Sequence, residues 1–150
     1  MADPVMSSSV DKDAILGILT QAFVHRYHSL AQYILDAGPY VRADDEPLLR
    51  RIREIAAYDH AAAERLADVI EELDGIPQAP PYQHEFAELN YLSLTYLKDI
   101  LREQLAEQLA DYKRGLPRLD GCALARNAVH SVCQALRAQI SELRSFPETK

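Results

Sequence analysis

The chain has 150 residues, 48% of them apolar and 26% charged, and a formal net charge of −7, which suits one globular domain with a substantial core. The negative charge disfavours nucleic acid or an anionic membrane surface as a partner, since phosphate recognition needs clustered lysine and arginine. No apolar run approaches the roughly 20 residues that cross a bilayer, and the first ten residues lack the basic region and apolar core of a signal peptide. We therefore expect a cytoplasmic protein that binds neither nucleic acid nor membrane.

Segments that favour helix alternate with stretches rich in glycine and proline, such as "DGIPQAPP" and "GLPRLDG". The predicted helices cover residues 10–37, 44–74, 85–114 and 122–145. Each helix carries an apolar stripe at helical spacing, and strand signals are absent. The pattern predicts an all-α four-helix bundle over residues 10–146, with a flexible N-terminal segment at 1–9 and a tail at 147–150.

The direction of the third helix depends on where that helix begins. A second helix of about 31 residues is about 46 Å long. If the third helix begins at Tyr82, the linker permits only an antiparallel neighbour. If it begins near Leu89, residues 75–88 reach roughly 46–50 Å when extended, and their prolines favour an extended path. A long crossover between the second and third helices is therefore possible, and an antiparallel hairpin is the alternative.

One charged residue interrupts the apolar face of the second helix. Asp59 lies on the same heptad line as Ile52, Leu66 and Leu73. Arg26 lies in a comparable position in the first helix, between Leu19 and Tyr33. Both charges are thus predicted to face the core of the bundle.

Two stretches of the sequence resemble the ferritin-like superfamily, which includes bacterioferritins, Dps-like proteins and rubrerythrins. They are "VHRYHSLAQYILDAG" at 24–38 and "AAAERLADVIEELDGIP" at 61–77. The resemblance covers residues 14–77 and extends to the later helices only in outline. It implies a four-helix bundle with a long crossover and two iron ions, held by a glutamate on each of two helices and a Glu-x-x-His pair on each of the others.

Most of the metal ligands that the resemblance implies are replaced in this chain. Arg26 stands at the position of the first-helix glutamate, and Asp59 and Ala62 stand at the Glu-x-x-His pair of the second helix. The third helix has no counterpart, since Glu103 and Glu107 lie away from the centre of its stripe. Two iron ions need bridging carboxylates to neutralise them, and a guanidinium repels metal.

The fourth helix offers Asn127 and His130 for its Glu-x-x-His pair, although the local stripe favours a register one residue earlier. We interpret His130 as the best single candidate ligand, because it could point inward. The other histidines are interpreted as residues of helix flanks or the surface: His25, His28, His60 and His84. Cys133 is expected to be a buried thiol, and a bridge to Cys122 would require Cys122 to fold back from the preceding loop.

The leading hypothesis is a ferritin-like bundle with a degenerate di-iron site, no cofactor and no catalytic activity, which serves a binding or structural role as a homodimer or higher homo-oligomer. In place of the metal we expect a buried, bidentate ion pair between Arg26 and Asp59. One alternative is a divergent iron-binding or oxidative-stress protein with a non-standard site on Asp59 and His130. Another is an unrelated helical interaction module, if the linker between the second and third helices is short. The sequence identifies no small-molecule ligand.

Overall fold

The computed structural model describes residues 9–81 and 92–146, and 81% of these are helical. The elements are α1 (Ser9–Tyr27), α2 (Leu30–Asp36), η1 (Ala43–Asp45), α3 (Glu46–Glu72), α4 (Leu94–Gly115), η3 (Leu116–Leu119) and α5 (Ala123–Arg144). No strand is present in this part of the chain, which confirms the all-α prediction, and none of its helices could cross a membrane. The predicted terminal segments lie, apart from Ser9, outside the described residues, as do residues 85–91 of the predicted third helix.

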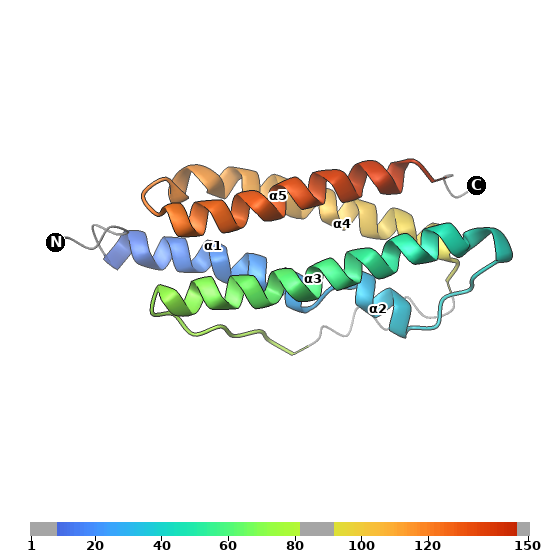
Figure 1. Cartoon of the computed structure of the whole chain (residues 1–150), viewed down its shortest axis with the longest axis horizontal. Coiled ribbons are helices and arrows are strands. Elements are labelled where there is room, and N and C mark those ends of the chain that lie inside the picture. Colours follow the sequence, from blue (N-terminus) through green and yellow to red (C-terminus); the bar gives the residue numbers. More distant parts are fainter. Residues whose placement is uncertain (1–8, 82–91, 147–150) are drawn as a thin grey trace.

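The long helices form a bundle in which α3 packs along α1 and α2, while α4 packs along α5 (Figure 1). α3 and α5 also contact one another, whereas α1 and α4 touch at few points. The bundle therefore has a loose side, the seam between α1 and α4.

α3 and α4 run in the same direction (Figure 1). At one end, the residues just before the two helices pair, since the Tyr40 N–H donates to the Leu92 carbonyl and the Leu94 N–H donates to the Tyr40 carbonyl, both at 3.0 Å. At the other end, Asp74 after α3 lies 3.6 Å from Lys12 at the start of α1. The two helices therefore do not form the antiparallel hairpin considered from the sequence, and that alternative is wrong.

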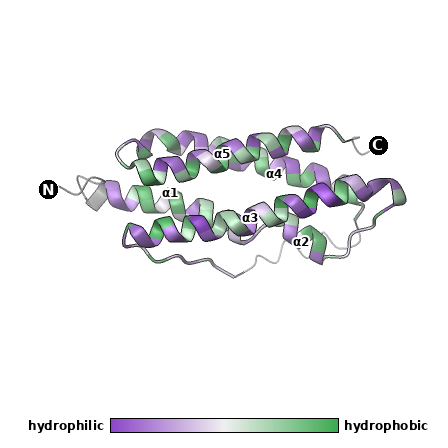
Figure 2. Cartoon of the chain, in the orientation of Figure 1, coloured by the Kyte–Doolittle hydropathy of each residue, from purple (hydrophilic) through white to green (hydrophobic). Residues whose placement is uncertain are grey.

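The core is built from the apolar stripes of the helices, along which hydrophobic and hydrophilic residues alternate (Figure 2). Leu19, Ile52, Leu66, Leu101 and Val129 are at most 1% exposed. Burial of each such side chain contributes about 1.5–3 kcal/mol to folding. Cys122 and Cys133 are buried within this core as free thiols, as expected for Cys133.

The predicted first helix is not continuous, because α1 ends at Tyr27 and α2 begins at Leu30. Ser29 has extended backbone angles, and its Oγ accepts a hydrogen bond from the Gln32 N–H at 3.2 Å, so it is the N-cap of α2. The break turns Ser29 toward the core, where it is 4% exposed. This local change of direction is what brings the Ser29 hydroxyl to the buried charges described next.

Candidate functional site

A buried ion pair joins α1 to α3 in the middle of the bundle. Arg26 Nη1 donates to Asp59 Oδ1 at 2.9 Å, and the two side chains are 1% and 3% exposed. The helical register places both residues on the inner face, because Arg26 follows Ala22 and Phe23 and Asp59 follows Ile55 and Ala56 in the buried stripes. The pair stands at the two positions that the sequence predicted.

The geometry of the pair differs from the predicted bidentate arrangement. The second carboxylate oxygen, Asp59 Oδ2, accepts from Ser29 Oγ at 2.7 Å. The second terminal nitrogen, Arg26 Nη2, donates to Gln108 Oε1 on α4. The bidentate prediction is therefore wrong, because each partner divides its bonds between the ion pair and a third side chain. The resulting network links α1, α2, α3 and α4.

Burial dominates the electrostatics of this network. Desolvation raises the pKa of Asp59 above its usual value, and the charge of Arg26 and the hydrogen bonds from Ser29 and Arg26 oppose that shift. Arg26 stays charged because a guanidinium does not lose its proton in proteins. Its Nε is buried and has no hydrogen-bond partner among the described residues. If either Arg26 or Asp59 were removed, the charge of the other would therefore remain buried without its counter-charge.

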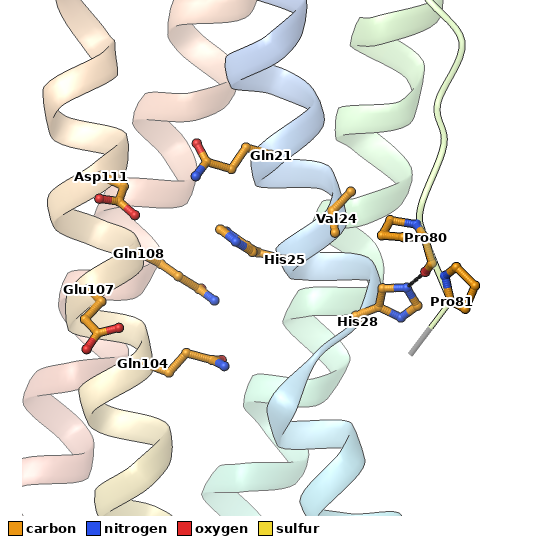
Figure 3. Close-up of a pocket in the computed structure, with 10 residues that line it drawn as sticks. All are labelled: Gln21, Val24, His25, His28, Pro80, Pro81, Gln104, Glu107, Gln108 and Asp111. Atoms are coloured by element: carbon orange, nitrogen blue, oxygen red, sulfur yellow. Dashed lines mark hydrogen bonds between the residues drawn. The ribbon is translucent and has the colours of Figure 1, made fainter. Parts of the chain in front are cut away.

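Next to the ion pair, a tyrosine and a histidine form a second buried contact. His25 Nδ1 lies 2.6 Å from the Tyr112 hydroxyl, which belongs to α4 and is fully buried. Burial and the nearby charge of Arg26 lower the pKa of His25 to about 4, so its ring is neutral at neutral pH. Burial also raises the pKa of Tyr112, which therefore keeps its proton. His25 was expected on a helix flank, but its half-buried ring points across the seam toward α4 (Figure 3).

A pocket of about 320 Å³ opens in the seam between α1 and α4. Its polar lining comes from both helices, and Figure 3 shows these side chains on the two sides of the space. They include Gln21, His25, Gln104, Glu107, Gln108 and Asp111. Beyond α1, His28 Nε2 contacts the Pro80 carbonyl, which fastens the segment after α3 to the end of α1 (Figure 3). Gln108 connects this pocket to the ion pair, since it contributes to both.

The remaining positions of the implied iron site do not form a metal centre. Ala62 is fully buried and offers only a methyl group. Asn127 and His130 are exposed on α5, so the expectation that His130 points inward is wrong. Val129 occupies the buried position in that turn of α5, so the next residue, His130, faces outward. A site built on Asp59 and His130 is excluded, since Asp59 is 2% exposed inside the bundle and His130 faces outward.

The donor set that surrounds Asp59 does not fit a di-iron centre. The Asp59 carboxylate is bonded by the Arg26 guanidinium and the Ser29 hydroxyl, and the Gln108 amide accepts from the same guanidinium, whereas two iron ions need several bridging carboxylates. Within residues 9–81 and 92–146, no group of three or more histidine, cysteine, aspartate or glutamate side chains is placed to hold a metal ion.

Two residues of the network were missed by the sequence reading although signals for both are present. Ser29 begins a Ser-x-x-Gln pattern with Gln32, which is typical of a helix N-terminus. Gln108 falls on the line that runs from Leu101 through Leu105 to Tyr112, at alternating spacings of four and three residues. A buried glutamine on such a line indicates a polar partner across the core.

The sequence matches no protein-family model, and neither a curated protein nor a solved structure matches this chain.

Proposed function

We propose that this chain is a ferritin-like bundle whose di-iron site has been replaced by the Arg26–Asp59 ion pair and which serves a non-catalytic binding or structural role without metal. The parallel course of α3 and α4 supports the ferritin-like part, because a long connection between these helices is the topology that the resemblance implies. We further propose that the protein is cytoplasmic, that it has no nucleic-acid partner, and that it forms a homodimer or a higher homo-oligomer.

The observation that carries the proposal is the position of the Arg26 guanidinium. It is buried between Asp59 of α3 and Gln108 of α4, and its charge is fixed. A divalent ion bound to Asp59 would have to lie beside this positive charge in a poorly solvated interior, where like charges repel strongly. The Arg26 guanidinium therefore supplies the positive charge that a bridging metal ion would otherwise supply.

The test is the response of the whole chain to ferrous iron. Protein purified from iron-supplemented culture should contain far less than one iron per chain by elemental analysis, and it should oxidise ferrous iron no faster than buffer. Chelator should leave the melting temperature unchanged, because a metal held only by the folded state would otherwise have stabilised it. Two tightly held iron ions per chain, or a melting temperature that falls with chelator, would contradict the proposal.

The oligomeric part of the proposal has a separate test. Sedimentation velocity of the full chain at micromolar concentration should give the mass of a dimer or a larger assembly. A single species at the 16.9 kDa of one chain would contradict it without affecting the metal-free proposal.

A further inference from the structure

The seam pocket between α1 and α4 has the size and lining of a small-molecule site. Its volume of about 320 Å³ lies at the lower end of the range of about 300–1,000 Å³ that is typical of ligand pockets. The seam is the side on which the bundle helices make few contacts, so the cavity follows from the packing of the helices. The polar groups around it divide into hydrogen-bond donors at its base and carboxylates nearer the surface.

Gln108 supplies the first donor at the base of the pocket. Its side chain is nearly buried, at 6% exposed, and its carbonyl oxygen already accepts from Arg26. The amide nitrogen is therefore turned away from Arg26 and points into the space between the helices (Figure 3). No described residue accepts a hydrogen bond from it, so an acceptor on a ligand would complete its bonding.

His25 supplies the second donor. We assign the proton of the 2.6 Å contact to the Tyr112 hydroxyl, which then donates to His25 Nδ1. The proton of the neutral imidazole is then on Nε2. No described residue takes a hydrogen bond from Nε2, and the ring lines the pocket.

The carboxylates of Glu107 and Asp111 give the outer part of the pocket its negative charge. The two residues are one helical turn apart on α4 and line the same space (Figure 3). Glu107 has no ion-pair partner among the described residues, and Asp111 pairs only with Arg114, whose side chain is 72% exposed. Within the part of the chain that the structure describes, no lysine or arginine lines the pocket. A positively charged group is therefore favoured here and an anion is disfavoured.

We propose that the seam pocket binds a small protonated organic amine that also carries a hydroxyl or carbonyl oxygen, with the ammonium at Glu107 and Asp111 and the oxygen at Gln108 and His25. Gln108 and Asp111 are three residues apart on one helix, where side chains start about 5–6 Å from one another. The oxygen and the ammonium of the ligand must therefore be separated by only a few bonds. This inference specifies the ligand class for the binding role proposed above and rests on that role.

The experiment is an NMR titration of the full chain with 2-aminoethanol, which carries both groups. Ethylammonium lacks the oxygen and ethanol lacks the charge, so they are the matched probes. We expect saturable shifts of the Gln108 side-chain amide and the His25 ring with a dissociation constant of about 0.1–10 mM, given the low affinity ceiling of so small a ligand. Each matched probe should bind at least about tenfold more weakly, since each loses one set of hydrogen bonds.

Variants locate the binding in the pocket. Glu107→Gln combined with Asp111→Asn keeps the size of both side chains and should weaken 2-aminoethanol binding at least about tenfold. Glu103→Gln is the control, because Glu103 is exposed on the same helix and does not line the pocket. Equal affinities of wild type and double variant, or no saturation by about 100 mM, would overturn the inference. If the chain holds no iron and does not bind the amine, only the proposed amine site is contradicted. If the chain holds iron and binds the amine, only the proposal of a metal-free bundle is contradicted.

Discussion

Removing one partner of the buried ion pair should destabilise the fold far more than removing an exposed charge. Asp59→Ala deletes the acceptor of both Arg26 and Ser29 and leaves a guanidinium that is 1% exposed with Gln108 as its remaining acceptor. Arg26→Ala leaves a carboxylate that is 3% exposed with only the Ser29 hydroxyl. Each substitution strands a buried charge, which costs roughly 3–5 kcal/mol. Domains of this size are stable by about 5–15 kcal/mol, so each variant should lose a large part of its stability.

Urea denaturation of the single and double variants measures this cost and isolates the pair. Arg26→Met combined with Asp59→Leu removes both charges and restores apolar volume, so it should recover much of the loss of either alanine variant. The matched control is Glu142→Ala, which breaks the Arg51–Glu142 pair. The two atoms lie 2.6 Å apart, but the side chains are 34% and 37% exposed, so the loss should be less than about 1 kcal/mol. If Asp59→Ala or Arg26→Ala costs no more than this control, the reasoning about the buried pair is refuted.

Two further predictions follow from single residues. His25 has a pKa of about 4 in the folded chain and about 6.5 in the unfolded chain, so between these pH values the unfolded chain binds one more proton. The free energy of unfolding should therefore fall as the pH is lowered from about 6.5 to 4. We expect a loss of about 1–2 kcal/mol, after a discount for the half-exposed ring. His25→Gln should flatten this part of the urea-derived stability curve and His130→Gln, on the surface, should not; the opposite pattern would contradict the assignment. Asp74 follows α3 with φ of 65°, a left-handed conformation that favours glycine, and its side chain makes an exposed ion pair with Lys12 at 3.6 Å. Asp74→Gly should therefore stabilise the fold by about 0.5–1 kcal/mol and Asp74→Ala should not, and a thermal midpoint that drops in the glycine variant would count against this.

The helices and the positions of the two buried charges were accessible from the sequence, because both depend on periodicity within one helix. Asp59 on the line of Ile52 and Leu66 had to face the core once that segment became a helix. The continuous first helix was predicted wrongly, since apolar periodicity continues through residues 28–29 and only the capping serine marks the break.

The partners across the bundle were not accessible in the same way. That Asp59 bonds Ser29, and that Arg26 reaches Gln108, depends on how the helices are rotated relative to one another, which no single-helix pattern fixes. The register of the fourth helix is a different case, because its own apolar stripe already favoured Val129 as the buried residue, and the structure places Val129 in the core and His130 on the surface. The seam pocket arises from the loose contact of α1 with α4, which are far apart in the sequence.

A crystal structure from crystals grown with excess ferrous iron tests most directly the proposal that a salt bridge stands where a metal would bind. Diffraction data collected at the iron absorption edge should show no anomalous peak between α1 and α3, and Arg26 Nη1 should lie within hydrogen-bond distance of Asp59 Oδ1, as in the 2.9 Å contact described here. An anomalous peak bound to Asp59, with the Arg26 guanidinium displaced from it, would contradict the claim.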